Sequence, residues 1–547
     1  MPILLFGQVP PDSTSFISPV EHTIRLAGSF AELRSNHFHS GIDIKSTAGL
    51  DGDPILSSDM GYISRIKVES SGYGNALYID HPNGYTTVYA HLSEFSPEIE
   101  RYVKKIQNKT ESFPVDIYVD AKKFNFKKGE KIGSMGNTGR SSAPHLHFEI
   151  RETLSERPVL PSKFNIKTKD TVAPKITGVY VYELDEDGYE VNKVQVRIVK
   201  EGNGYVTKPD VIKVNADYAG IGIVAYDQTN GQANKNGVYN LTISNSDSLY
   251  FNAQFDRLDF NESKAINDII DYKHYQKFGT KIMKLFASEC SPLSNYKQNS
   301  GLGLLPLSDG SPSFYRVKVS DDYQNFSTFE IGLSKVTQSN IDRSNGKDLV
   351  QCGVRDTIRL ESGTKIILSE KSLYQSQEIV VQEELAEGSY SISILSNGTP
   401  AHDPFKIVIP NHTDEKFILT KVDKNGRRVN FGGYISQGNF INYLDEFGTY
   451  RLEKDLIAPS INRSAVTTKE SSKQYLFSIS DNLRSDSGLG DLSIDCKACG
   501  QWVLYYFDKK NSQIIIDQRD ILPNCKSLLV VARDFSGNQT ELNQPIR

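Results

Sequence analysis

The chain has 547 residues, too many for one hydrophobic core, and this length predicts roughly three to five domains. Tyr and Phe are plentiful (28 and 26), whereas there are 4 Met and 1 Trp, a balance that favours β-structure over helix bundles. The formal net charge is −5 with acids and bases well mixed, and the lack of a basic stripe excludes the electrostatic footprint of a nucleic-acid-binding protein.

The N-terminus leaves two interpretations open. Met1 is followed by Pro-Ile-Leu-Leu-Phe-Gly-Gln and soon by a polar Pro-Pro-Asp-Ser-Thr-Ser stretch. The apolar run is too short for the core of a signal peptide and lacks a basic leader. It is therefore either the tail end of a truncated signal peptide, which predicts export, or a short buried strand. No run of about 18 apolar residues follows, so we expect no membrane-spanning segment.

Residues 1–168 have the pattern of one β-rich unit. Short β-like runs at 61–68, 76–80 and 85–90 alternate with glycine turns. Asn83-Gly84, between the last two runs, is a hairpin signal.

Residues 96–126 interrupt this pattern. The stretch from Ser96 to Asn108 has apolar residues at helical spacing, namely Ile99, Val103 and Ile106. The strand pattern resumes at Lys128. We therefore predict an insertion at 96–126 in a β-scaffold, placed next to His91.

The rest of the chain contains a repeated pattern. Asp170-Thr-Val-Ala-Pro174 and Asp455-Leu-Ile-Ala-Pro459 each begin a segment with two later strands that end in Asp. These aspartates are Asp227, Asp321, Asp481 and Asp534. The repeat predicts β-sandwich domains at 169–336 and 455–547. Residues 337–454 lack the Ala-Pro start, but their alternating strand patterns predict a third β-domain. Within the first repeat, the pattern of residues 265–285 predicts a helical or irregular insert.

The repeated aspartates have two interpretations. An Asp after a strand commonly caps a turn through its own side chain, and we expect that role here. Calcium ligation at a domain edge is the alternative.

Five cysteines do not make a disulfide framework in a chain of this length. Cys496 and Cys499 are the only close pair, and Cys525 alone follows them. A zinc ribbon would need a second pair. We therefore expect a local disulfide or two ordinary thiols.

Seven of the ten histidines precede residue 148, and five chemically competent residues form three short motifs. The motifs are His39-Ser-Gly-Ile-Asp43, Tyr89-Ala-His91-Leu92 and Pro144-His145-Leu-His147-Phe-Glu149. A catalytic zinc takes three protein ligands and keeps a fourth position for water. Two His and one Asp at ligand-like spacing, with two further His, therefore predict a hydrolytic zinc site.

The local geometry sharpens this prediction. Gly41 between His39 and Asp43 indicates a loop or a strand end. His145 and His147 are two residues apart on an apolar strand, so both face one side. One of the pair can bind metal while the other works beside it.

Zinc lowers the pKa of its bound water to about 7 and polarises a scissile carbonyl. Amide hydrolysis also needs a base and a group that stabilises the oxyanion, and His91 with one histidine of the pair can supply them. We expect His81 to be an exposed turn residue. His37, two residues before His39, could lie in the outer layer around the metal ligands, but we assign it no role.

From about Gly28 to Arg151 the chain resembles the lysostaphin/LytM-type zinc endopeptidases, which cut peptidoglycan cross-bridges. Besides the three histidine motifs, the resemblance rests on Gly61-Tyr-Ile-Ser, Gly72-Tyr-Gly-Asn75, Lys128-Gly-Glu-Lys-Ile-Gly133 and Gly136-Asn-Thr-Gly139. It implies that His39, Asp43 and His147 bind zinc, and that His91 and His145 orient water and stabilise the transition state. The main departure is the insertion at 96–126, which could cover or shape the groove.

We therefore expect an all-β fold, in which a compact metallopeptidase sheet precedes immunoglobulin-like β-sandwich domains. The resemblance implies a zinc-dependent endopeptidase that hydrolyses peptide bonds in peptidoglycan cross-links or stem peptides, in the periplasm or cell envelope. The alternative is a regulatory or scaffold protein that activates another cell-wall hydrolase. Envelope proteins are possible binding partners of the C-terminal β-sandwich domains.

Overall fold

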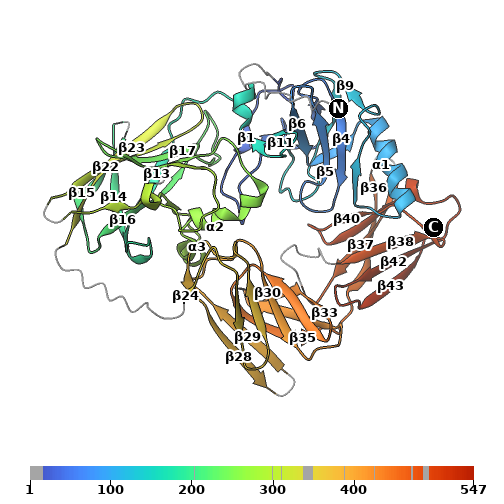
Figure 1. The fold of residues 1–547 in the computed structure, drawn as a ribbon. Coiled ribbons are helices and arrows are strands. Elements are labelled where there is room, and N and C mark those ends of the chain that lie inside the picture. Colours follow the sequence, from blue (N-terminus) through green and yellow to red (C-terminus); the bar gives the residue numbers. More distant parts are fainter. Residues whose placement is uncertain are drawn as a thin grey trace, which may run out of the picture.

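The structure is a computed structural model. It describes residues 16–546 apart from 203, 299, 309–310, 337–348, 387–388, 424, 470–471 and 484–491. Strands hold 49% of the residues and helices 8%, which confirms the all-β prediction. The sheets form four groups along the chain (Figure 1). No helix in the described residues is long and apolar enough to cross a membrane.

The first group contains a nine-stranded and a three-stranded sheet. The large sheet has the order β1-β2-β11-β6-β5-β4-β8, with β12 and β9 at its margins, and the small sheet has the order β3-β10-β7. The strands are β1 (Leu26–Gly28), β2 (Ile42–Lys45), β3 (Pro54–Leu56), β4 (Gly61–Val68), β5 (Asn75–Asp80), β6 (Tyr85–Ala90), β7 (Leu92–Phe95), β8 (Val115–Tyr118), β9 (Asn125–Phe126), β10 (Lys131–Met135), β11 (His145–Glu152) and β12 (Pro158–Val159).

Strand β11 separates the core of this group from its polar face. Leu146, Phe148 and Ile150 are fully buried and belong to the hydrophobic core. Because side chains alternate along a strand, His145, His147 and Glu149 point to the opposite face. β2 and β6 flank β11 as antiparallel neighbours, so residues from three strands meet on that face.

The predicted helix in the insertion is confirmed as α1 (Pro97–Thr110). Pro97 occupies the first helical turn, where its missing N–H costs no hydrogen bond. Ile99 and Val103 are buried on one face, and the helix ends at Glu111 in the left-handed conformation. A 3₁₀-helix, η2 (Pro161–Phe164), closes the first group.

The second group is an eleven-stranded sheet with short helices, which confirms the helical insert. Its strands are β13 (Lys175–Leu184), β14 (Glu190–Glu201), β15 (Gly204–Val214), β16 (Tyr218–Tyr226), β17 (Asn240–Ser244), β18 (Leu249–Gln254), β19 (Met283–Lys284), β20 (Tyr296–Gln298), β21 (Leu305–Pro306), β22 (Ser313–Ser320) and β23 (Phe326–Lys335). Its helices are η3 (Phe260–Ala265), α2 (Ile266–Ile269), α3 (Tyr272–Phe278) and η4 (Ser300–Gly303).

The third group has two five-stranded sheets and one two-stranded sheet, and the fourth has two four-stranded sheets. The strands of the third group are β24 (Leu349–Val350), β25 (Asp356–Arg359), β26 (Lys365–Leu368), β27 (Gln377–Glu378), β28 (Val380–Ala386), β29 (Ser389–Leu395), β30 (Phe405–Pro410), β31 (Phe417–Val422), β32 (Arg428–Gly432), β33 (Tyr434–Ser436), β34 (Asn439–Leu444) and β35 (Gly448–Lys454). The fourth contains β36 (Ser460–Lys469), β37 (Ser472–Ser480), β38 (Ser493–Ala498), β39 (Gln501–Trp502), β40 (Tyr506–Asp508), β41 (Gln513–Asp517), η5 (Gln518–Asp520), β42 (Ser527–Arg533) and β43 (Gln539–Pro545).

The fourth group returns to the first, so the chain closes on itself (Figure 1). Phe113, just after α1, meets the ring of Tyr506 edge-on with centroids 5.3 Å apart. Lys104 on α1 lies 3.7 Å from the carboxylate of Asp520. Lys510 donates to the carbonyl of Asn137 at 2.5 Å. The insertion is therefore a docking surface for the C-terminal sheets.

The cysteines pair differently from the sequence expectation. Cys499 is bonded to Cys525, and Cys496 is a buried free thiol. The prediction that Cys496 and Cys499 form a local disulfide or remain two thiols was therefore wrong. Cys496 lies inside β38 and contributes to the core, whereas Cys499 lies in the turn after it. A second disulfide joins Cys290 to Cys352, linking the second group to the third.

Candidate metal centre

Three side chains of the predicted ligand set come from two paired strands and one loop. Asp43 on β2 is the direct cross-strand partner of His147 on β11. His39 lies in the loop before β2, which is held by a backbone hydrogen bond from His39 N–H to the carbonyl of Glu32 at 3.0 Å. All three are at least 94% buried.

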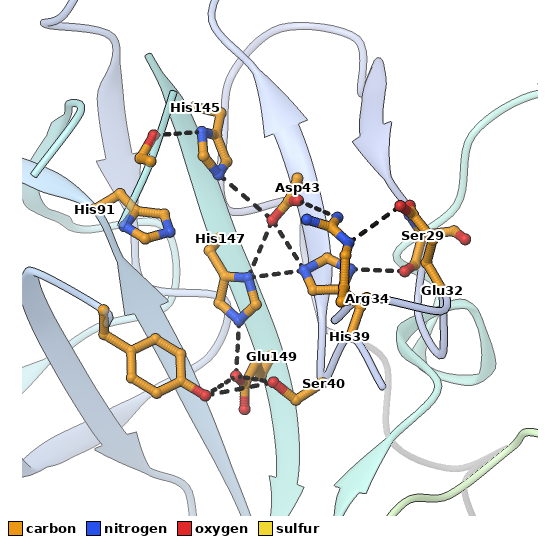
Figure 2. Close-up of polar contacts among 12 residues, drawn as sticks. Ser29, Glu32, Arg34, His39, Ser40, Asp43, His91, His145, His147 and Glu149 are labelled. Atoms are coloured by element: carbon orange, nitrogen blue, oxygen red, sulfur yellow. Dashed lines mark hydrogen bonds and ion pairs between the residues drawn. The ribbon is translucent and has the colours of Figure 1, made fainter. Parts of the chain in front are cut away.

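Three potential ligand atoms form an equilateral triangle (Figure 2). Nε2 of His39, Nδ1 of His147 and Oδ1 of Asp43 are each 3.0 Å from the other two. Zinc binds imidazole nitrogen and carboxylate oxygen at about 2.0–2.2 Å, so ligand atoms of a tetrahedral site lie a little over 3 Å apart. The triangle therefore has the size of one face of such a site.

The outer hydrogen bonds of the two imidazoles fix which nitrogens carry protons. Nδ1 of His39 contacts the Ser29 carbonyl at 2.7 Å, which can only accept, so this nitrogen donates. Nε2 of His147 lies 2.7 Å from Oε1 of Glu149 and donates to that carboxylate. In the neutral rings, the lone pairs of the other nitrogens face Asp43. Three acceptors then converge with no proton between them, which is the arrangement a metal cation satisfies.

The electrostatics of the triangle favour a positive charge. Burial alone would raise the pKa of Asp43, but the charge of His39 and hydrogen bonds with the neighbouring imidazoles hold it well below its usual range. Burial lowers the pKa of His147, yet hydrogen bonds with Asp43 and Glu149 outweigh it and raise the pKa to about 9. Either a proton or a metal ion bound between these atoms would supply the positive charge that the triangle favours.

A second layer of polar groups holds the ligands in place. Arg34 donates from Nη2 to the outer oxygen of Asp43 at 2.9 Å. Oε1 of the fully buried Glu149 also accepts from Ser40 and Tyr73 at 2.7 Å, and Oε2 accepts from Arg151 at 2.6 Å. Burial opposes ionisation of Glu149, but the charge of Arg151 and the bond from His147 keep its pKa well below the usual value.

His91 and His145 lie beside the triangle on one side (Figure 2). Their ring centroids are 4.8 Å apart, and Nε2 of His145 is 3.5 Å from Oδ1 of Asp43. His145 is oriented through Nδ1, which contacts the Ala143 carbonyl at 2.8 Å. Burial and the nearby rings of His147 and His145 lower the pKa of His91 to about 3, so its ring is neutral near pH 7.

His91 follows β6 directly and has φ of 62°, a conformation that non-glycine residues rarely adopt. Its Nδ1 contacts the Thr138 carbonyl at 2.8 Å, which leaves Nε2 free of a proton. Thr138 is held by a close approach of two glycines. A Cβ on Gly139 would lie 2.3 Å from the backbone nitrogen of Gly74. The two glycine motifs of the sequence thus position His91.

A cavity of about 950 Å³ opens over this cluster. Its walls include Arg140 and Ser142 from the loop before β11 and Gln232, Asn234 and Phe260 from the second group. Lys45 donates to Gln232 at 3.1 Å and to Asn234 at 2.5 Å, which ties the second group to β2. No residue of 96–126 lines the cavity, so the insertion, for which a role in covering or shaping the groove was left open, contributes nothing to its walls.

The structure brings together all five predicted site residues and excludes two other histidines. The His37 ring is exposed and contacts the Ser35 carbonyl rather than a member of the cluster. His81 is buried at 6% exposure, so its expected position in an exposed turn was wrong. Its ring packs inward because Nδ1 contacts the Met60 carbonyl and Nε2 contacts the Thr87 hydroxyl.

The roles of Glu149, Arg151 and Arg34 did not emerge from the sequence. A signal for two of them was present, since positions 145, 147, 149 and 151 of one strand share a face and spell His-x-His-x-Glu-x-Arg. Arg34 lies on an irregular loop and gave no such signal.

The chain matches the model of Peptidase family M23 over residues 37–108 and 116–161. DD-carboxypeptidase/endopeptidase Mpg of Neisseria meningitidis serogroup B is 35% identical over 152 residues, which are 28% of this chain and 26% of Mpg. Peptidoglycan DD-endopeptidase ShyA of Vibrio cholerae serotype O1 is 29% identical over 175 residues, which are 31% of this chain and 34% of ShyA. The matched part of the chain therefore spans only about a quarter to about a third of the length of these relatives.

Among solved structures, the catalytic domain of lysostaphin from Staphylococcus simulans is 22% identical. The likeness covers 26% of this chain and 91% of that chain, with a TM-score of 0.19.

Proposed function

We propose that this chain, whose N-terminal sheets form a peptidase family M23 domain, is a zinc-dependent endopeptidase that hydrolyses peptide bonds in peptidoglycan cross-links or stem peptides. The observation that carries the proposal is the triangle of acceptors made by His39, Asp43 and His147, with sides of 3.0 Å. Two nitrogens and one oxygen are the donor set of many catalytic zinc sites.

His39, Asp43 and His147 are the proposed metal ligands. Bound zinc would supply Lewis acidity, lowering the pKa of a water and polarising the scissile carbonyl. Glu149 holds His147 in the tautomer that presents Nδ1, and the Ser29 carbonyl does the same for Nε2 of His39. These outer bonds set ring orientation before any ligand arrives.

His91 and His145 are the proposed catalytic pair. Nε2 of His91 carries no proton, so it can accept one from the attacking water. Nδ1 of His145 is held by the Ala143 carbonyl, so Nε2 remains to take part in the reaction. In its protonated form this ring can donate to the oxygen that becomes negative in the tetrahedral intermediate. Both rings line the cavity, from which a substrate carbonyl would approach.

The substrate class comes from the named relatives, and the cavity is compatible with it. Mpg is named a DD-carboxypeptidase/endopeptidase, and ShyA is named a peptidoglycan DD-endopeptidase. The cavity of about 950 Å³ is lined by Lys45 and Arg140, besides the Arg34 that pairs with Asp43. These cations suit the free carboxylates of stem peptides.

We also propose that the four groups of sheets are separate domains, with boundaries near residues 168, 336 and 454. The two disulfides support an oxidising compartment, which fits a periplasmic or envelope location. We further propose that the three C-terminal domains bind other proteins of the cell envelope.

The test is digestion of purified sacculi by the zinc-loaded protein and by protein stripped of metal. We expect uncross-linked or trimmed peptides from the zinc-loaded sample only, and recovery when zinc is returned to the stripped one. A zinc-loaded protein that releases nothing from sacculi of several cross-link types would reject the enzyme. It would favour a regulator that activates another hydrolase.

A further inference from the structure

Three acidic side chains form a cluster in the second group of sheets, far from the histidine cluster in the sequence. Asp170 precedes β13, Asp227 follows β16 directly, and Asp321 follows β22. One carboxylate oxygen from each lies within 4.8 Å of the others. Asp227 and Asp321 are 5% and 3% exposed.

The turn-capping role expected for these residues is confirmed for Asp321. Its Oδ1 accepts from the backbone N–H groups of Tyr323 and Asn325, each at 2.8 Å. Asp170 likewise accepts from the backbone N–H of Val172 through Oδ1 at 2.9 Å. Capping accounts for these oxygens but leaves others unused.

Four buried oxygens around this cluster have no hydrogen-bond partner among the described residues. They are Oδ2 of Asp170, Oδ1 of Asp227, Oγ1 of Thr229 and Oδ1 of Asn236. Thr229 and Asn236 are each 4% exposed, and all four residues line one small cavity of about 50 Å³. A buried acceptor without a partner costs free energy, so four of them around one cavity call for a common partner.

No lysine or arginine in the described residues forms an ion pair with Asp170, Asp227 or Asp321. Burial and repulsion from Asp170 and Asp321 raise the pKa of Asp227 to about 8, and burial raises that of Asp170 to about 6. Among the described residues, the three carboxylates therefore lack a cation paired with them.

We propose that the carboxylate cluster of Asp170, Asp227 and Asp321, with Thr229 and Asn236 beside it in the small cavity, is a calcium site. Calcium takes six to eight oxygen ligands in flexible geometry, which fits a mixed set of carboxylate, amide and hydroxyl oxygens completed by water. Magnesium demands a tighter octahedron and fits this irregular set less well. Both carboxylate oxygens of Asp321 already accept hydrogen bonds, Oδ2 from Nδ2 of Asn325 at 2.7 Å, so Asp321 contributes its negative charge as well as a shared oxygen.

The site lies at the junction between the peptidase domain and the second group. Ile24, Ser29 and Ile42 of the peptidase domain line the same cavity. The N–H of Gly237, next to Asn236, donates to the Ser29 hydroxyl at 2.9 Å. The Ser29 carbonyl is the group that orients His39. Bound calcium would therefore stiffen the segment that positions one metal ligand of the active site.

The C-terminal repeat provides a comparison inside the same chain. Asp455, Asp481 and Asp534 are the corresponding residues, and Asp534 caps its turn by accepting from the N–H of Asn538 at 2.7 Å. Their oxygens do not form a comparable cluster within the described residues. Nδ2 of Asn482 donates to Oδ1 of Asp455 at 3.3 Å, so this carboxylate oxygen already has a donor. We expect the strong site only in the first copy.

The experiment is calcium titration of the full-length zinc-loaded protein by calorimetry, with melting temperature as a second readout. We expect one site with a dissociation constant of about 10⁻⁵–10⁻³ M, a rise of several degrees in melting temperature, and a weaker response to magnesium. Asp227→Asn should weaken binding at least tenfold. Because Asn is neutral, close to Asp in size and free of the cost of ionising a buried carboxyl, this variant should melt no lower than wild type in calcium-free buffer.

Three further variants locate the effect. Asp187→Asn, in an exposed turn of the second group, and Asp481→Asn, in the second repeat, should bind calcium like wild type. Asp43→Ala should lose zinc and keep calcium, which separates this site from the proposed active site. The proposal is overturned if wild type shows neither heat nor a melting shift with millimolar calcium, or if Asp227→Asn binds as tightly as wild type.

Discussion

Asp43 lies directly opposite His147 across β2 and β11, and its Oδ1 is 3.0 Å from Nδ1 of His147. The register of one strand pair thus fixes two of the three proposed ligands to each other. A slip of one residue would turn His147 into the core and replace it with Leu146 or Phe148. The full burial of those two side chains opposes this slip, so packing in the core of the sheet fixes the geometry of the proposed metal site.

The contact between His147 and Glu149 predicts the effect of Glu149→Gln. Removal of the negative charge weakens the hold on the His147 ring, and such outer partners typically contribute 10–100-fold to metal affinity. We expect a loss of about that size in competition with a zinc chelator, together with lower stability because Arg151 loses its partner. Glu152→Gln is the matched control, since Glu152 is on the same strand but pairs with Arg257. Equal zinc affinity in both variants would contradict the role of Glu149.

The contact between Gly139 and Gly74, which supports His91 through Thr138, predicts that Gly139→Ala and Gly84→Ala will differ in their effect on activity. Gly139 and Gly84 both have positive φ, at 69° and 84°. A Cβ at Gly139 would meet the backbone of Gly74, whereas nothing lies within 4 Å of a Cβ at Gly84. Each alanine variant should lose roughly 1–2 kcal/mol from the backbone conformation.

Only Gly139→Ala should also displace Thr138 and lower the turnover number, by tenfold or more, without loss of metal. Initial rates on a peptidoglycan substrate and unfolding curves of both variants check this. Similar rates for Gly139→Ala and Gly84→Ala would show that Thr138 does not need this glycine contact to position His91.

The docking of the C-terminal sheets predicts that Phe113→Ala acts on structure and spares catalysis. The substitution removes the contact with Tyr506, so amide hydrogen exchange in β40 should become faster. Turnover should change less than twofold because no residue of 96–126 lines the cavity. Tyr118→Ala is the control, as Tyr118 is 74% exposed in the same insertion. A large loss of activity in Phe113→Ala alone would give the insertion a catalytic role.

The disulfide between Cys290 and Cys352 closes a loop with a sequence separation of 62 residues. Loop-closure entropy predicts that its removal costs up to about 4 kcal/mol of stability in the part of the chain that it joins. Denaturant unfolding of the Cys290→Ala/Cys352→Ala variant measures this cost. Cys496→Ala, which removes the free thiol, is the comparison. An unfolding curve like that of wild type would show that the second and third groups hold together without the bond.

Local patterns in the sequence were enough to predict the alternation that puts His145 and His147 on one face, and the helix in the insertion. They could not predict contacts between distant segments. Asp43 and His147 are 104 residues apart, and only the family resemblance joined them at the sequence level. Cys499 pairs with Cys525 rather than with Cys496, because Cys496 is on β38 and its side chain is buried in the hydrophobic core. His81 was misplaced because its inward partners, Met60 and Thr87, lie on other parts of the sheet.

The most direct test of the central claim compares wild type with His145→Ala on purified sacculi, with fragments identified by mass spectrometry and zinc measured on the same samples. His145 lies 3.5 Å from Asp43 but outside the triangle of ligand atoms. We predict that the variant keeps its zinc and releases no peptide fragments, whereas wild type releases fragments whose new ends identify the cleaved bond. Full hydrolysis by zinc-loaded His145→Ala would contradict the catalytic role assigned to this histidine.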